Sequence, residues 1–302
     1  MAQGEWARRV LSRRSAMKGA LAVGVTATLA AACTEAPQTG GQGGGNTLQR
    51  LRDAGTVRVG IAGEIPYGFT RDGEVTGESP EVAKAVFKAI GVPNVEATQV
   101  EFGQLIPGLN AGQYDMVAAG MAIIPQRCKQ AQFSAVDYVT NTAFLVPQGN
   151  PEGVNNFEDV KAKGVTLAVL SGTIEQQVAQ ALDIADVQTY GAQADMLQAI
   201  QAGRAYAGAL TDISLRALLD QNPDAQLEVT EGFVPIVDGV EQIQAGGFVF
   251  RKGDTDLVNA FNQELQKIHE NGQWLEIVRP FGFTEDNLPP ADVTTEQLCS
   301  GE

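Results

Sequence analysis

The chain has 302 residues, of which 44% are hydrophobic and 19% are charged, so it can form two domains with packed cores. Residues 1–32 hold five basic residues and one acidic residue, which leaves the remainder with 16 basic and 35 acidic residues and a formal charge of −19. That charge argues against nucleic acid as a partner. The single histidine and the absence of closely spaced cysteines disfavour zinc sites and His-dependent catalytic triads, and we expect no metal and no cofactor.

The amino terminus predicts export. Residues 1–32 combine the Arg13-Arg14 pair with a small apolar run that is too short to span a bilayer, as in a twin-arginine signal peptide. The small residues before Cys33 resemble a lipoprotein processing site, where Cys33 becomes the lipidated first residue; the alternative is an Ala-x-Ala cleavage with Cys33 as a bystander. Residues 33–47 then form a Gly-rich flexible tether. We expect an extracytoplasmic protein, periplasmic or on the cell surface, held at the membrane by a lipid anchor only.

The rest of the chain alternates predicted strands and helices. Apolar patterning predicts strands over 56–62, 95–102, 115–120, 143–146, 165–170, 187–190, 205–210 and 248–250. Helical spacing predicts helices from Ser79 to Gly91 and over 105–111, 125–130, 156–161, 194–202 and 257–271, with another after Thr173. Ser79 and Pro80 supply an N-cap and a first helical residue. This alternation predicts an α/β fold with parallel-type sheets covered on both faces.

Several short motifs, in this order, resemble the solute-binding proteins of polar amino acid ABC importers (family 3). They are Glu64–Phe69, Phe102–Leu109, Asp115–Met121, Pro125–Ser134, Leu170–Thr173 and Phe248–Asp254, and the resemblance covers residues 48–285. A finer likeness to the ectoine/hydroxyectoine-binding subfamily rests on Gly120-Met121, Arg127–Gln130, Pro280–Glu285 and Thr294–Cys299. The resemblance implies a two-lobed periplasmic-binding-protein-like fold of type II, with a ligand cleft between the lobes and two hinge strands.

The resemblance also implies an organisation and partners. Lobe 1 would comprise residues 48–143 and 245–302, and lobe 2 residues 148–240. The permease and the ATPase would be separate chains, since this sequence has no phosphate-binding P-loop, and the protein would act as a monomer. Export leaves Cys128 and Cys299 as either a disulfide or two buried thiols. By the resemblance, their pairing would tie the carboxy-terminal tail to the cleft wall of lobe 1.

Ligand-binding residues are carried over position by position. Arg127 matches the arginine that grips the ligand carboxylate through a bidentate fork, as opposed to a surface arginine. Backbone amides at Gly120 and Ala122 would help to hold the same carboxylate. Thr173 follows a strand end where exposed amides suit an anion. An ordinary helix cap near Ser171 is the alternative, and the two roles can coexist.

The remaining predicted contacts concern the ligand body and its nitrogen. Glu64 would face the ligand nitrogen, as opposed to being a solvated loop residue. Tyr67 and Phe102 would form two aromatic walls for a delocalised cation. Phe69 and Phe144 are expected in the core or packed behind these walls. Ala122 is a departure if close relatives build a third aromatic wall there.

Thr211 discriminates between ligand classes. Ordinary α-amino-acid binders carry an aspartate at this point, whereas this chain has Leu210-Thr211-Asp212. A neutral Thr211 suits a ligand whose α-nitrogen is locked in a ring, such as ectoine or hydroxyectoine. A one-residue shift would bring Asp212 into the site and favour a polar α-amino acid instead.

Three classes of function follow. We expect the binding component of an ABC importer for ectoine or hydroxyectoine, with no catalytic residues, and a binding protein for a polar α-amino acid as the alternative. A periplasmic cyclic-acid dehydratase on the same fold is a remote alternative, since the predicted site offers only Glu64 as an acid or base. A sensory module is the third class, but no membrane span follows residue 33 in the sequence.

Overall fold

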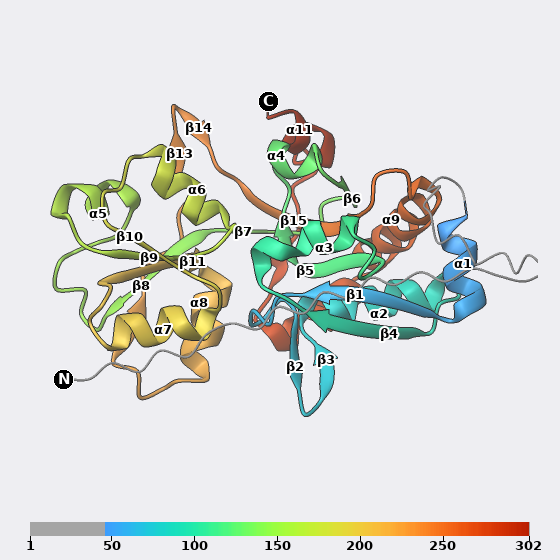
Figure 1. Ribbon diagram of the computed structural model, residues 1–302, viewed down its shortest axis with the longest axis horizontal. Coiled ribbons are helices and arrows are strands. Elements are labelled where there is room, and N and C mark those ends of the chain that lie inside the picture. Colours follow the sequence, from blue (N-terminus) through green and yellow to red (C-terminus); the bar gives the residue numbers. More distant parts are fainter. Residues whose placement is uncertain (1–45, 302) are drawn as a thin grey trace, which may run out of the picture. The chain divides into compact units, whose positions relative to one another are not determined.

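The computed structural model describes residues 46–301, which form a six-stranded and a five-stranded sheet with helices packed on them (Figure 1). The predicted export signal, Cys33 and nearly all of the predicted tether lie outside the described residues. Thr47, the last residue of that predicted tether, already begins helix α1 (Thr47–Ala54).

The first sheet has the strand order β4-β1-β5-β15-β6, and β7 pairs with another stretch of β15. Its strands are β1 (Thr56–Ile61), β4 (Asn94–Gln99), β5 (Met116–Ala122), β6 (Gln132–Phe133), β7 (Tyr138–Thr140) and β15 (Gln244–Phe250). The helices associated with it are α1, α2 (Glu78–Ala89), α3 (Leu105–Asn110), α4 (Pro125–Cys128), α9 (Thr255–Glu270), α10 (Gln273–Val278) and α11 (Thr295–Ser300). A small hairpin of β2 (Phe69–Arg71) and β3 (Glu74–Thr76) follows β1. Short 3-10 helices cover Phe102–Gln104, Arg279–Phe281 and Glu285–Asn287.

The second sheet has the strand order β10-β9-β11-β8-β12. Its strands are β8 (Thr142–Pro147), β9 (Leu167–Leu170), β10 (Val187–Tyr190), β11 (Ala207–Thr211) and β12 (Leu227–Val229). Its helices are α5 (Phe157–Lys163), α6 (Ile174–Ala181), α7 (Gln193–Gln201) and α8 (Asp212–Asp220). A hairpin of β13 (Ile236–Val237) and β14 (Val240–Glu241) precedes the return to the first sheet.

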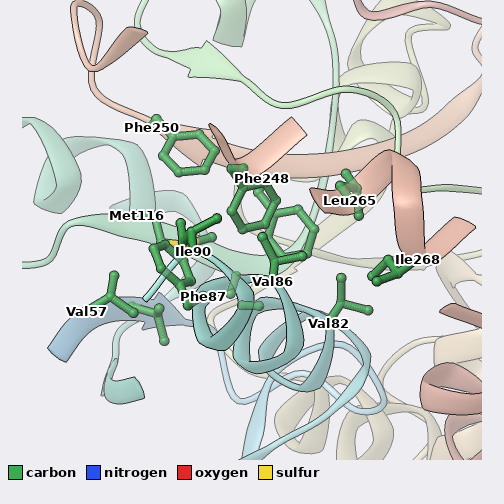
Figure 2. Close-up of a cluster of buried hydrophobic side chains, with 14 of the residues drawn as sticks. Val57, Val82, Val86, Phe87, Ile90, Met116, Phe248, Phe250, Leu265 and Ile268 are labelled. Atoms are coloured by element: carbon green, nitrogen blue, oxygen red, sulfur yellow. The ribbon is translucent and has the colours of Figure 1, made fainter. Parts of the chain in front are cut away.

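Each sheet buries apolar side chains on both faces, because successive residues of a strand point to opposite sides. In β5, Met116 and Ala118 pack with α2 and α9, whereas Val117 and Ala119 pack on the other face with α3. Figure 2 shows the first of these clusters, in which Met116 gathers with side chains from α2, α9 and β15. The second sheet is buried in the same way, with α5 and α6 on one face and α7 and α8 on the other. The prediction of helices on both faces is confirmed.

The expectation of parallel-type sheets is wrong for the strands that connect the two sheets. The strands β4, β1 and β5 are parallel, as are β10, β9 and β11, but β15 runs antiparallel to β5 and β8 runs antiparallel to β11. Both exceptions are strands that the chain enters when it crosses between sheets. Only Asn141 separates β7 from β8, and β8 already belongs to the second sheet from Thr142 onward.

The predicted start of α2 is also wrong. The helix begins at Glu78, one residue before the predicted cap Ser79, and the residue ahead of it is Gly77 with a φ of 122°. The Ser79 hydroxyl instead donates to the Glu78 carboxylate at 2.6 Å and accepts from the Gly120 amide at 3.1 Å. Ser79, which the local sequence pattern predicts to cap the helix, therefore makes a tertiary contact to β5 instead.

The disulfide between Cys128 and Cys299 is present, with the two Cα atoms 5.6 Å apart. It joins α4 to α11, which lie side by side in Figure 1. The predicted pairing is confirmed, and it fixes the carboxy-terminal helix against the short helix that carries Arg127.

Candidate functional site

Side chains from both sheets surround one small cavity. Its volume is about 30 Å³, which is room for only two or three water molecules at about 10–15 Å³ each. Its lining residues are Glu64, Tyr67, Phe102, Gly120, Ala122, Arg127, Thr173, Ile174, Glu175, Leu210, Thr211 and Gln244. The structure thus brings together all eight residues that the sequence predicts as ligand-binding, from the ends of β1, β4, β5, β9 and β11 and from α4, around the crossing strand β15.

Arg127 is buried at this cavity, with 6% of its surface exposed. Its guanidinium donates to the carbonyl oxygen of Ala122 at 2.8 Å and to that of Gly172 at 2.7 Å, and it lies 5.3 Å from the Phe102 ring centroid. Burial lowers the pKa of Arg127 to about 10, and the Glu175 carboxylate opposes that change. The guanidinium is therefore a buried cation at neutral pH, and two carbonyls use only part of its five-donor capacity.

Glu64 is the carboxylate that follows β1, and it too is buried. Its Oε1 accepts a hydrogen bond of 2.6 Å from the hydroxyl of Ser214 in α8. Burial raises the pKa of Glu64 to about 7, the Ser214 hydrogen bond opposes this, and the nearby Glu175 carboxylate adds to it. Near neutral pH this group therefore exchanges readily between its acid and its carboxylate.

Tyr67 and Phe102 supply aromatic surface to the cavity. The Tyr67 ring stacks on Tyr138 with 5.3 Å between centroids, and its hydroxyl donates to Thr211 Oγ1 at 3.1 Å. Gly120 has a φ of +63°, and a Cβ there would lie 2.3 Å from the Tyr67 ring, so only glycine lets the ring approach β5. The Gly120 amide, which the sequence analysis assigned to the carboxylate, donates to Ser79 instead.

Two other aromatic residues lie away from the cavity. Phe144 is fully buried in the second sheet, where it packs edge-on against Phe157 and Phe233. Phe69 is buried at the start of β2 and lines a separate cleft. Ala122 lines the cavity with a methyl group, so its side chain adds no aromatic wall.

Thr173 caps helix α6 at the cavity wall. Its side-chain oxygen accepts from the Gln176 amide at 3.4 Å and donates to the Leu170 carbonyl at 3.0 Å. From the sequence, we expect an anion contact at Thr173 or a helix cap near Ser171, with both roles able to coexist. The cap is Thr173 itself, so a cap and a cavity-lining hydroxyl coincide at this residue.

Thr211, and not Asp212, lines the cavity. The Asp212 carboxylate accepts from the Thr140 hydroxyl at 2.7 Å and from the Asn141 amide at 3.4 Å, at the crossing between β7 and β8. It lines a separate, wider cleft of about 960 Å³. The one-residue shift that would put an aspartate into the cavity does not occur in this structure.

Four cavity residues were not predicted from the sequence, and among them Glu175 adds a second buried carboxyl group. Its side chain is 2% exposed, and its Oε1 accepts from the Gln244 amide and from the Thr142 hydroxyl. The cavity therefore holds two carboxyl groups, and the expectation of Glu64 as the only acid or base is wrong. An acid in the first turn of a helix is a common surface feature, so Glu175 gave no signal of its own. Ile174, Leu210 and Gln244 complete the set.

None of the helices between residues 46 and 301 is long and apolar enough to cross a membrane. Over the same residues, no three His, Cys, Asp or Glu side chains are grouped so as to hold a metal ion.

Comparison with known proteins supplies a family. The family model of bacterial extracellular solute-binding proteins, family 3, matches residues 57–284. A probable amino-acid ABC transporter periplasmic-binding protein of Sinorhizobium fredii is 32% identical over 263 residues, covering 85% of this chain and 87% of that protein. The arginine-binding extracellular protein ArtP of Bacillus subtilis is 30% identical over 226 residues, covering 72% of this chain and 82% of that protein.

A solved structure agrees with these relatives. EhuB in complex with hydroxyectoine is 31% identical, with a TM-score of 0.75, over 85% of this chain and 99% of that chain. The predicted two-lobed fold and the predicted family are both confirmed. The chain belongs to the bacterial extracellular solute-binding proteins of family 3, which serve ABC importers of the amino-acid type.

Proposed function

We propose that this solute-binding protein captures ectoine or hydroxyectoine. The observation that carries the proposal is the neutral Thr211 at a cavity that also holds a buried arginine and buried carboxyl groups. A carboxylate at position 211 would neutralise a free α-ammonium, whereas a cyclic amidinium can pair with Glu64 and needs no negative charge there. The similarity to EhuB, whose structure contains hydroxyectoine, supports the same ligand class.

The proposed pose uses the buried charges at opposite ends of the ligand. Arg127 has donors beyond those engaged by Ala122 and Gly172, and these would grip the ligand carboxylate together with Thr173. Glu64 would ionise fully when it meets the ring nitrogens. Tyr67 and Phe102 would lie against the flat, delocalised cation.

The size of the cavity supports capture by lobe closure. A volume of about 30 Å³ is far below the size of a small-molecule pocket, so a ligand enters only when the elements around it separate. Hydrogen bonds join the two sheets' elements there, among them those from Tyr67 to Thr211, from Ser214 to Glu64 and from Arg127 to the Gly172 carbonyl. We propose that ligand contacts replace or supplement these bonds and shift the population toward the closed form.

The lobes and partners complete the proposal. Lobe 1 comprises residues 48–143 and 245–302, lobe 2 comprises residues 148–240, and the connections between them act as hinges. A permease and an ATPase on separate chains receive the ligand, and the protein works as a monomer tethered by a lipid on Cys33. Metabolic labelling with a palmitate analogue, compared between the native chain and Cys33→Ser, tests the anchor.

A polar α-amino acid, above all arginine, is the second candidate. The second buried carboxyl group at Glu175 favours a cationic ligand, and ArtP binds arginine. We propose no catalytic activity, although Glu64 and Glu175 together meet the minimum of two acid–base groups that a dehydratase needs. Incubation with cyclic hydroxy acids that can lose water, followed by mass spectrometry, tests that alternative.

A thermal-shift screen tests the ligand. Ectoine, hydroxyectoine, glycine betaine, glutamine, histidine and arginine are each added to ligand-free protein. A ligand at 100 times its Kd stabilises the folded state by about 2.7 kcal/mol, which gives a measurable rise in Tm. We expect the rise with the two ectoines, and a rise with arginine alone would favour the second candidate.

A further inference from the structure

The ionisable side chains at the cavity do not match a zwitterion in charge. The groups in question are Arg127, Glu64 and Glu175, together with the neutral phenol of Tyr67. With both carboxylates ionised, the lining carries one negative charge in excess. A bound zwitterion adds no net charge, so an unpaired negative charge would stay buried, which is costly.

Glu175 sits at a distinctive position in this set. It lies in the first turn of α6, and its carboxylate reaches the start of both crossing strands, Thr142 in β8 and Gln244 in β15. The charged and titratable groups that face it are Arg127 from α4 and Glu64 from the segment after β1, with Tyr67 on the same lining. The strands β8 and β15 present only neutral donors to it.

Both carboxyl groups are held by neutral partners. Glu64 accepts from the Ser214 hydroxyl, and Glu175 accepts from the Gln244 amide and the Thr142 hydroxyl. Such donors can serve a carboxylate, but they do not cancel its charge. In the proposed pose, the ligand cation pairs with Glu64 and the ligand carboxylate occupies Arg127. Glu175 is then left without a cation.

We propose that Glu175 determines which net ligand charge the cavity accepts, because it holds a proton when the ligand is a zwitterion and releases that proton to solvent when the ligand is a cation. The inference rests on the proposed function, and it names a specificity-determining residue of the same site. With Glu175 protonated, the net charges of the cavity lining and of a bound zwitterion add up to zero. With Glu175 ionised, the net charge of −1 on the cavity lining and the charge of a bound monocation add up to zero.

The environment of Glu175 supports this assignment. Burial raises the pKa of Glu175, and hydrogen bonds from its own backbone amide and from Gln244, together with the Arg127 charge, oppose that rise. A ligand carboxylate on Arg127 weakens that opposing charge, so a bound zwitterion raises the pKa of Glu175 further. A second ligand cation lowers it.

The test compares a zwitterion and a monocation between pH 6 and pH 8. Ectoine and arginine are titrated calorimetrically into ligand-free protein, and the ratio of the Kd for ectoine to the Kd for arginine is followed. Both ligands place a cation on Glu64, so ionisation of Glu64 cancels in this ratio. One proton of difference at Glu175 makes the ratio rise by at most about tenfold per pH unit.

We expect the ratio to rise at least tenfold over this range in the native protein and to be flat in Glu175→Gln. At pH 8, Glu175→Gln should shift the ratio at least tenfold toward ectoine. Glu64→Gln should weaken both ligands and keep the pH dependence of the ratio, whereas the exposed Glu158→Gln serves as the unperturbed control. The native measurement needs no variant, so misfolding of Glu175→Gln does not obscure the result.

Two results separate this inference from the proposed function. A ratio that stays flat in the native protein while ectoine binds would overturn the role of Glu175 and leave the ectoine proposal standing. Arginine binding that weakens tenfold in Glu175→Gln, with no ectoine binding at any pH, would overturn the proposed ligand and support the role of Glu175.

Discussion

Replacing Arg127 removes the central cation of the proposed site. Its planar fork reaches the carbonyl oxygens of Ala122 and Gly172 at 2.8 and 2.7 Å, which belong to elements of different sheets. A lysine keeps the charge, but its single ammonium cannot reach both carbonyls and a ligand carboxylate. Alanine removes the charge as well and leaves a desolvated ligand carboxylate without a partner.

The expected loss of binding free energy follows from the burial of the Arg127 guanidinium. Truncating one partner of a buried, hydrogen-bonded charge pair costs about 2–5 kcal/mol, which corresponds to a loss of about 30-fold to 5,000-fold in affinity. We expect Arg127→Lys at the lower end of this range and Arg127→Ala at the upper end.

The assay is calorimetric titration of ectoine, with thermal unfolding of each ligand-free variant as the check on folding. Arg204→Ala is the matched control, because this arginine is exposed and distant in sequence from every cavity residue of the first sheet. Arg127→Ala protein that folds and binds ectoine within threefold of the native affinity would refute the assignment of Arg127 to the carboxylate.

Three further predictions concern selectivity and stability. Thr211→Asp adds a carboxylate acceptor for an α-ammonium worth about 1–3 kcal/mol, so the preference for ectoine over glutamine should fall about fivefold to 150-fold in competition titrations; an unchanged preference would place Thr211 outside the ligand contacts. Reducing the Cys128–Cys299 bond, which spans a sequence separation of 171 residues, should lower the free energy of unfolding by about 2–5 kcal/mol in urea denaturation, and equal stability with and without reductant would contradict this. Burial and the neighbouring Asp137 raise the pKa of Glu78 well above its usual value. The stability that Glu78 contributes is therefore complete below the unfolded pKa and is lost as pH rises toward the folded pKa, by at most about 1.4 kcal/mol per pH unit. Glu78→Gln should remove this loss between pH 5 and pH 8, and parallel stability curves for the two proteins would disprove it.

Apolar periodicity was sufficient to find most of the elements that build the two sheets. The strand predicted over 187–190 and the helix predicted over 257–271 are both observed within two residues. Periodicity could not show strand direction. The strands β8 and β15 run antiparallel because the chain enters them from the other sheet, which is a property of the connections and not of the local residues.

Some residues of the candidate site could likewise be predicted from the sequence, and others could not. Arg127, Glu64 and Thr173 stand in motifs whose order along the chain resembles that of the family, and these residues do meet at one cavity with Thr211. Glu175 has no such motif, since its burial depends on Gln244 and Thr142, which lie 69 and 33 residues away in sequence. The prediction of Ser79 as a helix cap failed for the same reason, because its hydrogen-bond partner Gly120 is 41 residues away in sequence.

The most direct test of the ligand assignment is a calorimetric comparison at pH 7 of ectoine, hydroxyectoine, glutamine, histidine and arginine with ligand-free protein. The absence of an aspartate at Thr211 predicts that at least one of the two ectoines binds at least tenfold more tightly than each of the three amino acids. An amino acid that binds as tightly as the tighter-binding of the two ectoines would contradict the ligand assignment and identify this protein as an amino-acid-binding protein.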